Sequence, residues 1–241
     1  MKLSAKFPTL ATGDLSDPIK LGEVILAEIA KLPGKKIGFI GEHHSGVTTC
    51  MNYLEKSNAP ILCVYDSRGI IDSYSHTLAK YDDLRTAVNA DIPEISDMIS
   101  SGDFSQLVDL IRLGESFRKL LTWWSVLSLI ELYDQATNSK KPHTTIVFDL
   151  PYLPTAYNSY MHELVLVKRS PKWPNNAGVT EYAKDDGVTK ARAKVIIAIM
   201  DDHIEYASNT GNWNFSDIVN NDGDYTSLYA KLDKLLASLL V

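Results

Sequence analysis

The stretch IGFIGEHHSGVTTCMN, residues 37–52, has residue types and spacing that could bind a chain of phosphates. An apolar run ends at Gly41, four residues separate it from Gly46, and two threonines follow, beginning at Thr48. Glycines at these places let a backbone turn tightly and approach an anion, and the first threonine hydroxyl is placed to ligate Mg²⁺. Val47 stands where such a loop carries a lysine. That lysine normally reaches the β- and γ-phosphates, so the loop lacks a contact worth about 1.5–3 kcal/mol.

The loop by itself allows more than one interpretation. A glycine-bounded turn between a strand and a helix can form without any ligand. His43 and His44 could donate hydrogen bonds to phosphate or simply be exposed, and a metal site built on this pair would need a third ligand. The remaining segments of the chain have to decide between these interpretations.

Composition narrows the class of protein. A chain of 241 residues can form one large domain or two small ones, and its hydrophobic fraction of 45% is ordinary for a globular protein. The net charge of −6 argues against binding nucleic acid by bulk charge. The first 14 residues contain no long apolar core, so we expect no signal peptide, and no apolar run approaches 18 residues. Cys50 and Cys63 lie in apolar stretches without metal-ligand spacing. We therefore expect buried thiols in a cytoplasmic protein with no membrane role.

Hydrophobic patterns alternate between strand and helix periods. After a polar arm at residues 1–15, Asp17 and Pro18 mark a helix start. Residues 70–110 are expected to be helical in pieces. Strands are expected at residues 35–41, 61–66, 144–149, 163–167 and 217–221, and helices at 18–32, 48–56, 114–133, 189–206 and 226–240. This alternation predicts an α/β protein with a mainly parallel sheet and helices on both faces. Ligands of such sheets collect at the carboxyl ends of the strands, where Gly41, Asp66 and Asp149 would lie.

Three further segments resemble, in the same order, the P-loop nucleoside monophosphate kinases, especially thymidylate kinases and phage-type enzymes. HTTIVFDLPYLPTAYNSY is similar to a strand ending in Asp-Arg-Tyr, with Asp149 matching the acid and Leu150 replacing the arginine. The helix at 114–133 occupies the place of a helix that carries a substrate-contacting arginine. DIVNNDGDYTSLYAKLDKLLASLL resembles the last strand, turn and helix, whose turn lies against the ATP base.

The resemblance covers about residues 35–240 and implies a three-layer P-loop NTPase fold with a lid. The kinase-like domain would span residues 34–241, with the lid at about 170–190 and an arm and helix at 1–33. ATP and Mg²⁺ are the implied cofactors, with Thr48 and Asp149 holding the metal. The implied ATP-binding residues are Gly41, His43, His44, Ser45, Gly46, Val47, Thr48, Thr49, Asn221 and Asp222.

The same resemblance assigns the acceptor side. Residues implied to bind the acceptor nucleotide are Asp66, Arg68, Arg112, Arg118, Tyr152 and Tyr157, and those implied to be catalytic are Asp66, Arg118, Asp149 and Arg192. Purely structural roles stay open for some of these residues. Asp66 and Asp149 could simply cap strand ends, and Trp123 and Trp124 are better suited to a hydrophobic core than to stacking on a nucleobase. Cations that could replace the missing lysine are Lys35, Lys36, His43, His44 and the basic residues in or beside the lid, namely Lys168, Arg169, Lys184, Lys190, Arg192 and Lys194.

The sequence thus predicts a kinase that transfers the γ-phosphoryl group of ATP to a (deoxy)nucleoside monophosphate such as dTMP. Two alternatives are a nucleotide-binding member of the fold with impaired catalysis and a phage kinase that acts on a modified base in DNA. The acidic balance speaks against the latter. The expected partner is the monophosphate substrate rather than nucleic acid or membrane, and the apolar stretch 120–132 could support a homodimer.

Overall fold

The computed structural model describes residues 1–11, 13–41, 45–65, 70–101, 115–150, 159–168, 215–221 and 224–239, with short pieces at 180, 183–184, 189–191, 193–194 and 197–198. A five-stranded sheet runs through its centre in the order β2-β3-β1-β4-β5, and every neighbouring pair is parallel. The strands are β1 (Lys35–Gly41), β2 (Ile61–Val64), β3 (Thr145–Asp149), β4 (Glu163–Lys168) and β5 (Asp217–Asn220). All five begin within two residues of the positions predicted from the sequence.

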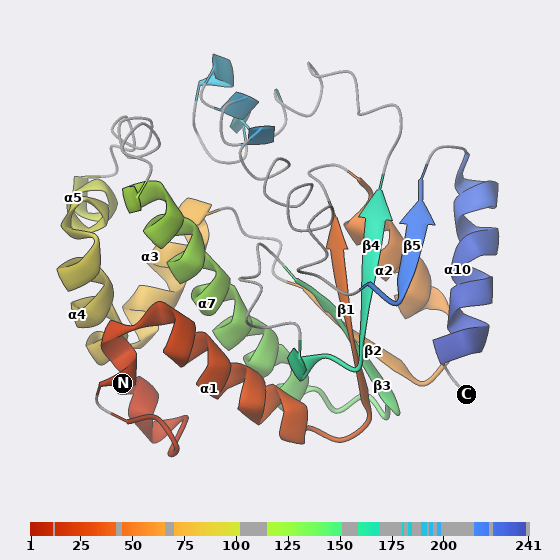
Figure 1. The fold of residues 1–241 in the computed structure, drawn as a ribbon, viewed down its shortest axis with the longest axis horizontal. Helices are drawn as coiled ribbons and strands as arrows, with labels where there is room; N and C mark the ends of the chain where they lie inside the picture. Colours follow the sequence, from red (N-terminus) through yellow and green to blue (C-terminus); the bar gives the residue numbers. More distant parts are fainter. Residues whose placement is uncertain are drawn as a thin grey trace.

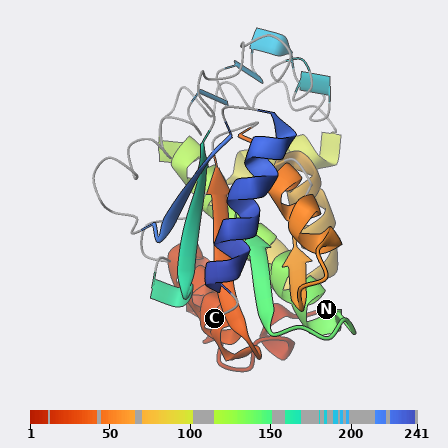
Figure 2. The ribbon, with the colours of Figure 1, turned by 90° about the vertical axis from the view of Figure 1, so that its right-hand side faces the viewer.

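Helices cover both faces of the sheet (Figure 1). α2 (Val47–Lys56) and α10 (Tyr225–Leu239) pack against one face, and Figure 2 shows them side by side in front of the strands. The other face is covered by α1 (Pro18–Lys31), α3 (Ile70–Lys80) and α7 (Glu115–Asn138), with α4 (Asp82–Asp91) and α5 (Pro93–Ser101) farther out. The predicted three-layer α/β architecture is confirmed. The predicted lid lies almost wholly outside the described residues.

Local sequence signals account for where these helices begin. The carboxylate of Asp17 accepts hydrogen bonds from the backbone of Ile19 and Lys20, at 3.0 and 3.3 Å, and Pro18 fills the first helical position. A proline suits that position because its missing N–H has no helical partner there. Pro93 begins α5 in the same way.

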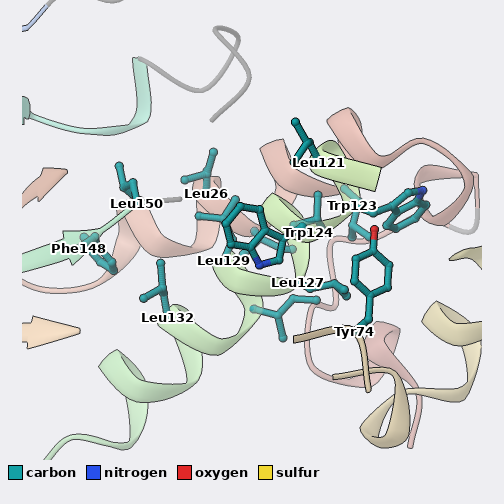
Figure 3. Packing of buried hydrophobic residues seen from close by; sticks show 14 of the residues in the cluster. Leu26, Tyr74, Leu121, Trp123, Trp124, Leu127, Leu129, Leu132, Phe148 and Leu150 are labelled. Atoms are coloured by element: carbon teal, nitrogen blue, oxygen red, sulfur yellow. The ribbon is translucent and has the colours of Figure 1, made fainter. Parts of the chain in front are cut away.

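The larger of the two cores lies between the sheet and α7, and Figure 3 shows its packing. Trp123 is fully buried, and its indole nitrogen donates to Asp91 at 2.9 Å. Trp124 is 9% exposed, and the hydroxyl of Tyr74 donates to the carbonyl of Leu120 at 2.8 Å. Both tryptophans are therefore core residues, as expected, and do not form a base-stacking shelf.

The same burial corrects one expectation. The apolar side chains of the 120–132 stretch are covered within the chain, so they cannot form an exposed dimer face. A homodimer stays a prediction and would have to use another surface.

The amino-terminal residues also differ from the polar arm expected from the sequence. Leu3 and Phe7 are fully buried, and the Leu3 backbone donates to the carboxylate of Asp83 in α4 at 2.8 Å. The ammonium of Lys6 pairs with Asp134 of α7. Leu3, Phe7 and Leu10 recur at helical spacing, which is the signal that marks this segment as part of the core. No helix in the described part of the chain is both long and apolar enough to cross a membrane.

Candidate phosphate-binding site

The glycine loop joins the carboxyl end of β1 to the start of α2, as predicted, and the structure shows why both glycines are needed. Gly46 has φ +100°, a left-handed conformation that side chains disfavour. A Cβ on Gly41 would lie 2.1 Å from Ser45 Oγ and 2.9 Å from the carbonyl oxygen of Val167. The loop therefore folds back onto the end of β1, and only a glycine leaves room for it.

The amino terminus of α2 is open to an anion. Its N-cap residue, Gly46, has no side chain that could cap the helix, and the first turn contains no acidic residue. The N–H groups of a first helical turn lack partners within the helix and carry the positive end of the helix dipole. A phosphate bound there would accept hydrogen bonds from them.

The hydroxyl of Ser45 lies in the same loop, 2.1 Å from where a Cβ on Gly41 would be. Its side chain is 1% exposed, and its hydroxyl oxygen has no hydrogen-bond partner among the described residues. Leaving a buried hydroxyl unsatisfied is unfavourable by about 1–3 kcal/mol. A phosphate oxygen in the loop would satisfy it, so this serine fits the ligand that the loop suits.

Asn221, which follows β5, braces the loop from the side. Its amide nitrogen donates to the carbonyl of Ser45 at 2.8 Å, and its backbone N–H donates to the carbonyl of Lys168 at 2.7 Å. A Cβ on Gly46 would lie 2.5 Å from that amide nitrogen. The structure thus places Asn221 beside the loop and shows a bracing role that the sequence did not indicate, while its contact with the ATP base stays a prediction. Asp222 lies outside the described residues.

Asp149, at the end of β3, lies on the same side of the sheet as α2. It pairs with Phe39 of β1 in the parallel ladder. Burial raises the pKa of the Cys50 thiol to about 12, and the negative charge of Asp149 contributes to that shift. Because Cys50 comes two residues after Thr48, the fold brings this carboxylate close to the first turn of α2.

This arrangement suits Mg²⁺ better than a metal held by the protein alone. Among the described residues, no group of three His, Cys, Asp or Glu side chains could hold a metal ion. Mg²⁺ needs only one or two protein ligands when phosphate oxygens and water complete its shell. The exposed hydroxyl of Thr48 and the partly buried carboxylate of Asp149 can supply them.

The two departures from the kinase motif are packing residues. A Cβ on Gly41 would lie 2.6 Å from Cγ2 of Val47, so the valine side chain lies against the end of β1. Leu150 is 3% exposed, and its Cδ1 lies 2.3 Å from where a Cβ on Gly38 would be. Leu150 is therefore part of the core (Figure 3). An arginine at this position would bury an unpaired positive charge, which is strongly unfavourable.

Two of the cations proposed to replace the loop lysine lie at the wrong end of the sheet. Lys35 pairs with Glu163 at 2.7 Å, and the ammonium of Lys36 donates to the carbonyl of Leu32. Both begin β1, so about 17–20 Å of extended strand separates them from Gly41. The expectation for these two lysines is wrong, because register along the strand, not nearness in sequence, decides which edge a side chain reaches.

Most of the remaining predicted residues lie outside the described part of the chain, and the structure describes only a few of them. Arg118 lies in the first turn of α7, which runs antiparallel to the strands and therefore starts near their carboxyl ends, but its side chain is not described. Lys184, Lys190 and Lys194 are exposed. Those outside are His43, His44, Asp66, Arg68, Arg112, Tyr152, Tyr157, Arg169 and Arg192.

A groove between α2 and α10 is a feature that the sequence analysis missed. The rings of Tyr53 and Tyr229 stack with centroids 4.1 Å apart, and Tyr225, 66% exposed, stacks on Tyr229 at 5.9 Å. With Thr49 and Lys56, these rings line a cavity of about 490 Å³. The available signal was the spacing of Tyr225 and Tyr229, one helical turn apart on α10.

No protein-family model matches the chain, and no curated protein is significantly similar to it. Among solved structures, the chain is similar to TT1252 from Thermus thermophilus, with a TM-score of 0.50 and 15% identity over 86% of this chain and 98% of that one. It is also similar to a dephospho-CoA kinase from Campylobacter jejuni, with a TM-score of 0.38 and 9% identity over 86% of this chain and 97% of the other.

The glycine loop between β1 and α2 and the parallel sheet order decide the fold class. The fold is that of a P-loop NTPase. The likeness to the Thermus structure concerns the fold alone, and the likeness to the Campylobacter enzyme is too weak to inform the function.

Proposed function

We propose that the chain binds ATP with Mg²⁺ and transfers the γ-phosphoryl group to a (deoxy)nucleoside monophosphate such as dTMP. One observation carries this proposal. The loop at the carboxyl edge of the sheet combines a helix terminus with a glycine at its N-cap and the buried hydroxyl of Ser45, which has no partner among the described residues, and Asp149 stands on the neighbouring strand.

In this proposal the residues of the chain position charge rather than react themselves. The amide groups of the α2 first turn and the Ser45 hydroxyl bind the phosphates of ATP, and Thr48 with Asp149 hold the metal. Mg²⁺ supplies positive charge to the transferring group, which is where such enzymes gain most of their rate. An oxygen of the acceptor phosphate forms a bond to the γ-phosphorus, the bond to the bridging oxygen breaks, and ADP leaves.

The tyrosine groove supports a nucleotide over a simple phosphate ion as the ligand. Thr49 belongs both to the loop motif and to the wall of the groove, so the two sites are continuous along α2. Exposed aromatic rings stack readily on nucleobases, at about 1–3 kcal/mol per base. The base of a nucleotide whose phosphates lie on the loop would therefore find a stacking partner in Tyr225.

A second candidate is a nucleotide-binding protein without catalytic activity. Val47 and Leu150 favour it, because both positions lack the cations that kinases of this type use and both are engaged in packing. This candidate predicts the same loop and the same ATP binding, without turnover.

The test is a turnover assay on the purified protein. It would be incubated with Mg·ATP and each deoxynucleoside monophosphate in turn, and diphosphate formation would be followed by chromatography. Asp149→Asn is the test variant. Asp217→Asn is the matched control, because Asp217 is an exposed carboxylate at the amino end of β5, away from the loop.

Turnover that survives in Asp217→Asn and is lost in Asp149→Asn is the expected result, and the preferred monophosphate would name the acceptor. ATP binding measured by calorimetry separates the two candidates. Saturable binding without turnover would favour the non-catalytic protein, whereas no binding at all would refute both.

A further inference from the structure

The loop lacks the positively charged side chain that would normally bind the phosphates of a nucleotide. A triphosphate bound to it would carry its β- and γ-phosphates at the place where Val47 stands instead of a lysine. Backbone amides and the Ser45 hydroxyl offer partial charge only. His43 and His44 of the loop lie outside the described residues, so among the described residues a group with full charge has to come from another element at the same edge of the sheet.

Lys168 is the lysine that the described part of the chain places directly beside this edge. In the parallel ladder Gly41 pairs with Val167, so Lys168 stands one residue beyond that pair. Strand spacing and rise put its Cα within about 6 Å of the Gly41 Cα. The other lysines whose positions are described at the carboxyl end of the sheet either bind another group or are exposed. The ammonium of Lys231, for example, donates a hydrogen bond to the carbonyl of Asn220.

The backbone of Lys168 is held in place while its side chain is left available. Its carbonyl accepts the hydrogen bond from Asn221, the residue that also braces the loop, and its neighbour across the ladder is Asn220 of β5. Its side chain is partly buried, and its ammonium has no hydrogen-bond or ion-pair partner in the described structure. A lysine keeps a point charge on a flexible stem, which suits contact with phosphate oxygens.

We propose that the ammonium of Lys168 takes the place of the missing loop lysine and binds the β- and γ-phosphates of a nucleoside triphosphate. The proposal rests on the proposed function, since it assumes that the loop holds a nucleotide. It makes the site one for triphosphates in particular, because a nucleoside monophosphate on the loop would not extend to this charge.

The test is ATP affinity, measured by calorimetry in the presence of Mg²⁺ on the full chain. Lys168→Met removes the charge and keeps most of the stem. Lys141→Met is the matched control, because Lys141 is an exposed lysine in the loop before β3, at the opposite edge of the sheet. We expect Lys168→Met to weaken ATP binding about 10- to 150-fold, the range for a hydrogen bond to a charged group, with affinity unchanged in the control.

A double variant tests whether the two positions serve the same phosphates. Adding Val47→Lys to Lys168→Met restores the lysine of the motif, and we expect ATP affinity to recover to within about tenfold of the wild type. Urea unfolding of each variant shows that the fold is intact. Wild-type affinity in Lys168→Met, or no recovery in the double variant, would overturn the assignment of Lys168 while leaving the proposed function in place. A wild-type protein that does not bind ATP would instead refute the proposed function itself.

Discussion

Replacing Gly46 with alanine tests the structure of the loop without any ligand. Gly46 holds φ +100° and ψ 23°, and its missing Cβ would lie 2.5 Å from the amide nitrogen of Asn221. Alanine at this position therefore adds a strained backbone and displaces the hydrogen bond from Asn221 to the Ser45 carbonyl. Both effects act on the folded state alone.

The magnitude follows from three terms. A left-handed conformation is unfavourable by about 1–2 kcal/mol for a residue with a Cβ. The lost hydrogen bond is worth about 0.5–1.5 kcal/mol. Alanine also restricts the unfolded chain, which stabilises the fold by about 0.4–1 kcal/mol. We expect Gly46→Ala to lower the free energy of unfolding by about 0.5–3 kcal/mol.

Gly13→Ala is the matched control. Gly13 has φ −73° and ψ −21°, ordinary for any residue, and no atom of the described residues lies within 4 Å of the position its Cβ would take. Its substitution carries the unfolded-state term and nothing else, so we expect slight stabilisation. The difference between the two variants isolates the loop terms, about 1.5–3.5 kcal/mol.

The assay is urea unfolding followed by tryptophan fluorescence, for which the fully buried Trp123 is a suitable probe. For a chain of this length each kcal/mol corresponds to about 2–4 °C in Tm, which provides an independent check by thermal unfolding. A difference below about 0.5 kcal/mol between the two alanine variants would refute the conclusion that Gly46 is held in a left-handed conformation against Asn221.

Two further predictions concern the same edge of the sheet and the thiols behind it. Asn221→Ala leaves the loop carbonyl without its donor, so we expect urea stability to fall by about 1–3 kcal/mol and ATP affinity to fall with it; unchanged affinity would show that the loop keeps its shape without this brace. Burial raises the pKa of Cys50 and of Cys63 to about 12, so both thiols stay protonated in the folded protein at about pH 8. We expect iodoacetamide to label them only after unfolding, and rapid labelling of the native protein would contradict their burial. Because the folded-state pKa is raised from 9.0, the stability that these thiols contribute is complete below about pH 9 and is lost as the pH rises towards 12, which urea midpoints at about pH 8 and pH 10 would show.

The elements that the sequence predicted best are those with strong local signals. The run KKIGFIG matches β1 residue for residue. A short apolar segment that ends in glycine is too short for a buried helix and is typical of a buried strand. The cap at Asp17 and the proline after it placed the start of α1. The pattern of the last helix placed α10 to within one residue. In each case the deciding interaction joins residues close in sequence.

Errors arose where residues distant in sequence meet. Leu3 and Phe7 read as part of a polar arm because their partners, α4 and α7, come about 75 or more residues later. The apolar stretch of α7 could have faced a second subunit until the fold showed α1 and α3 packed over it. A hydrophobic pattern shows that a face is covered but not what covers it.

The sequence by itself determined the elements, their order and a glycine loop that suits phosphate, because backbone conformation and hydrophobic period depend on near neighbours. Only the tertiary structure decided which charged residues lie near that loop. It set Lys35 and Lys36 at the far end of β1, brought Asp149 to the start of α2, and placed Lys168 beside Gly41. The physical reason is the parallel ladder: its register gathers the carboxyl ends of separate strands at one edge, and no spacing within the sequence records that register.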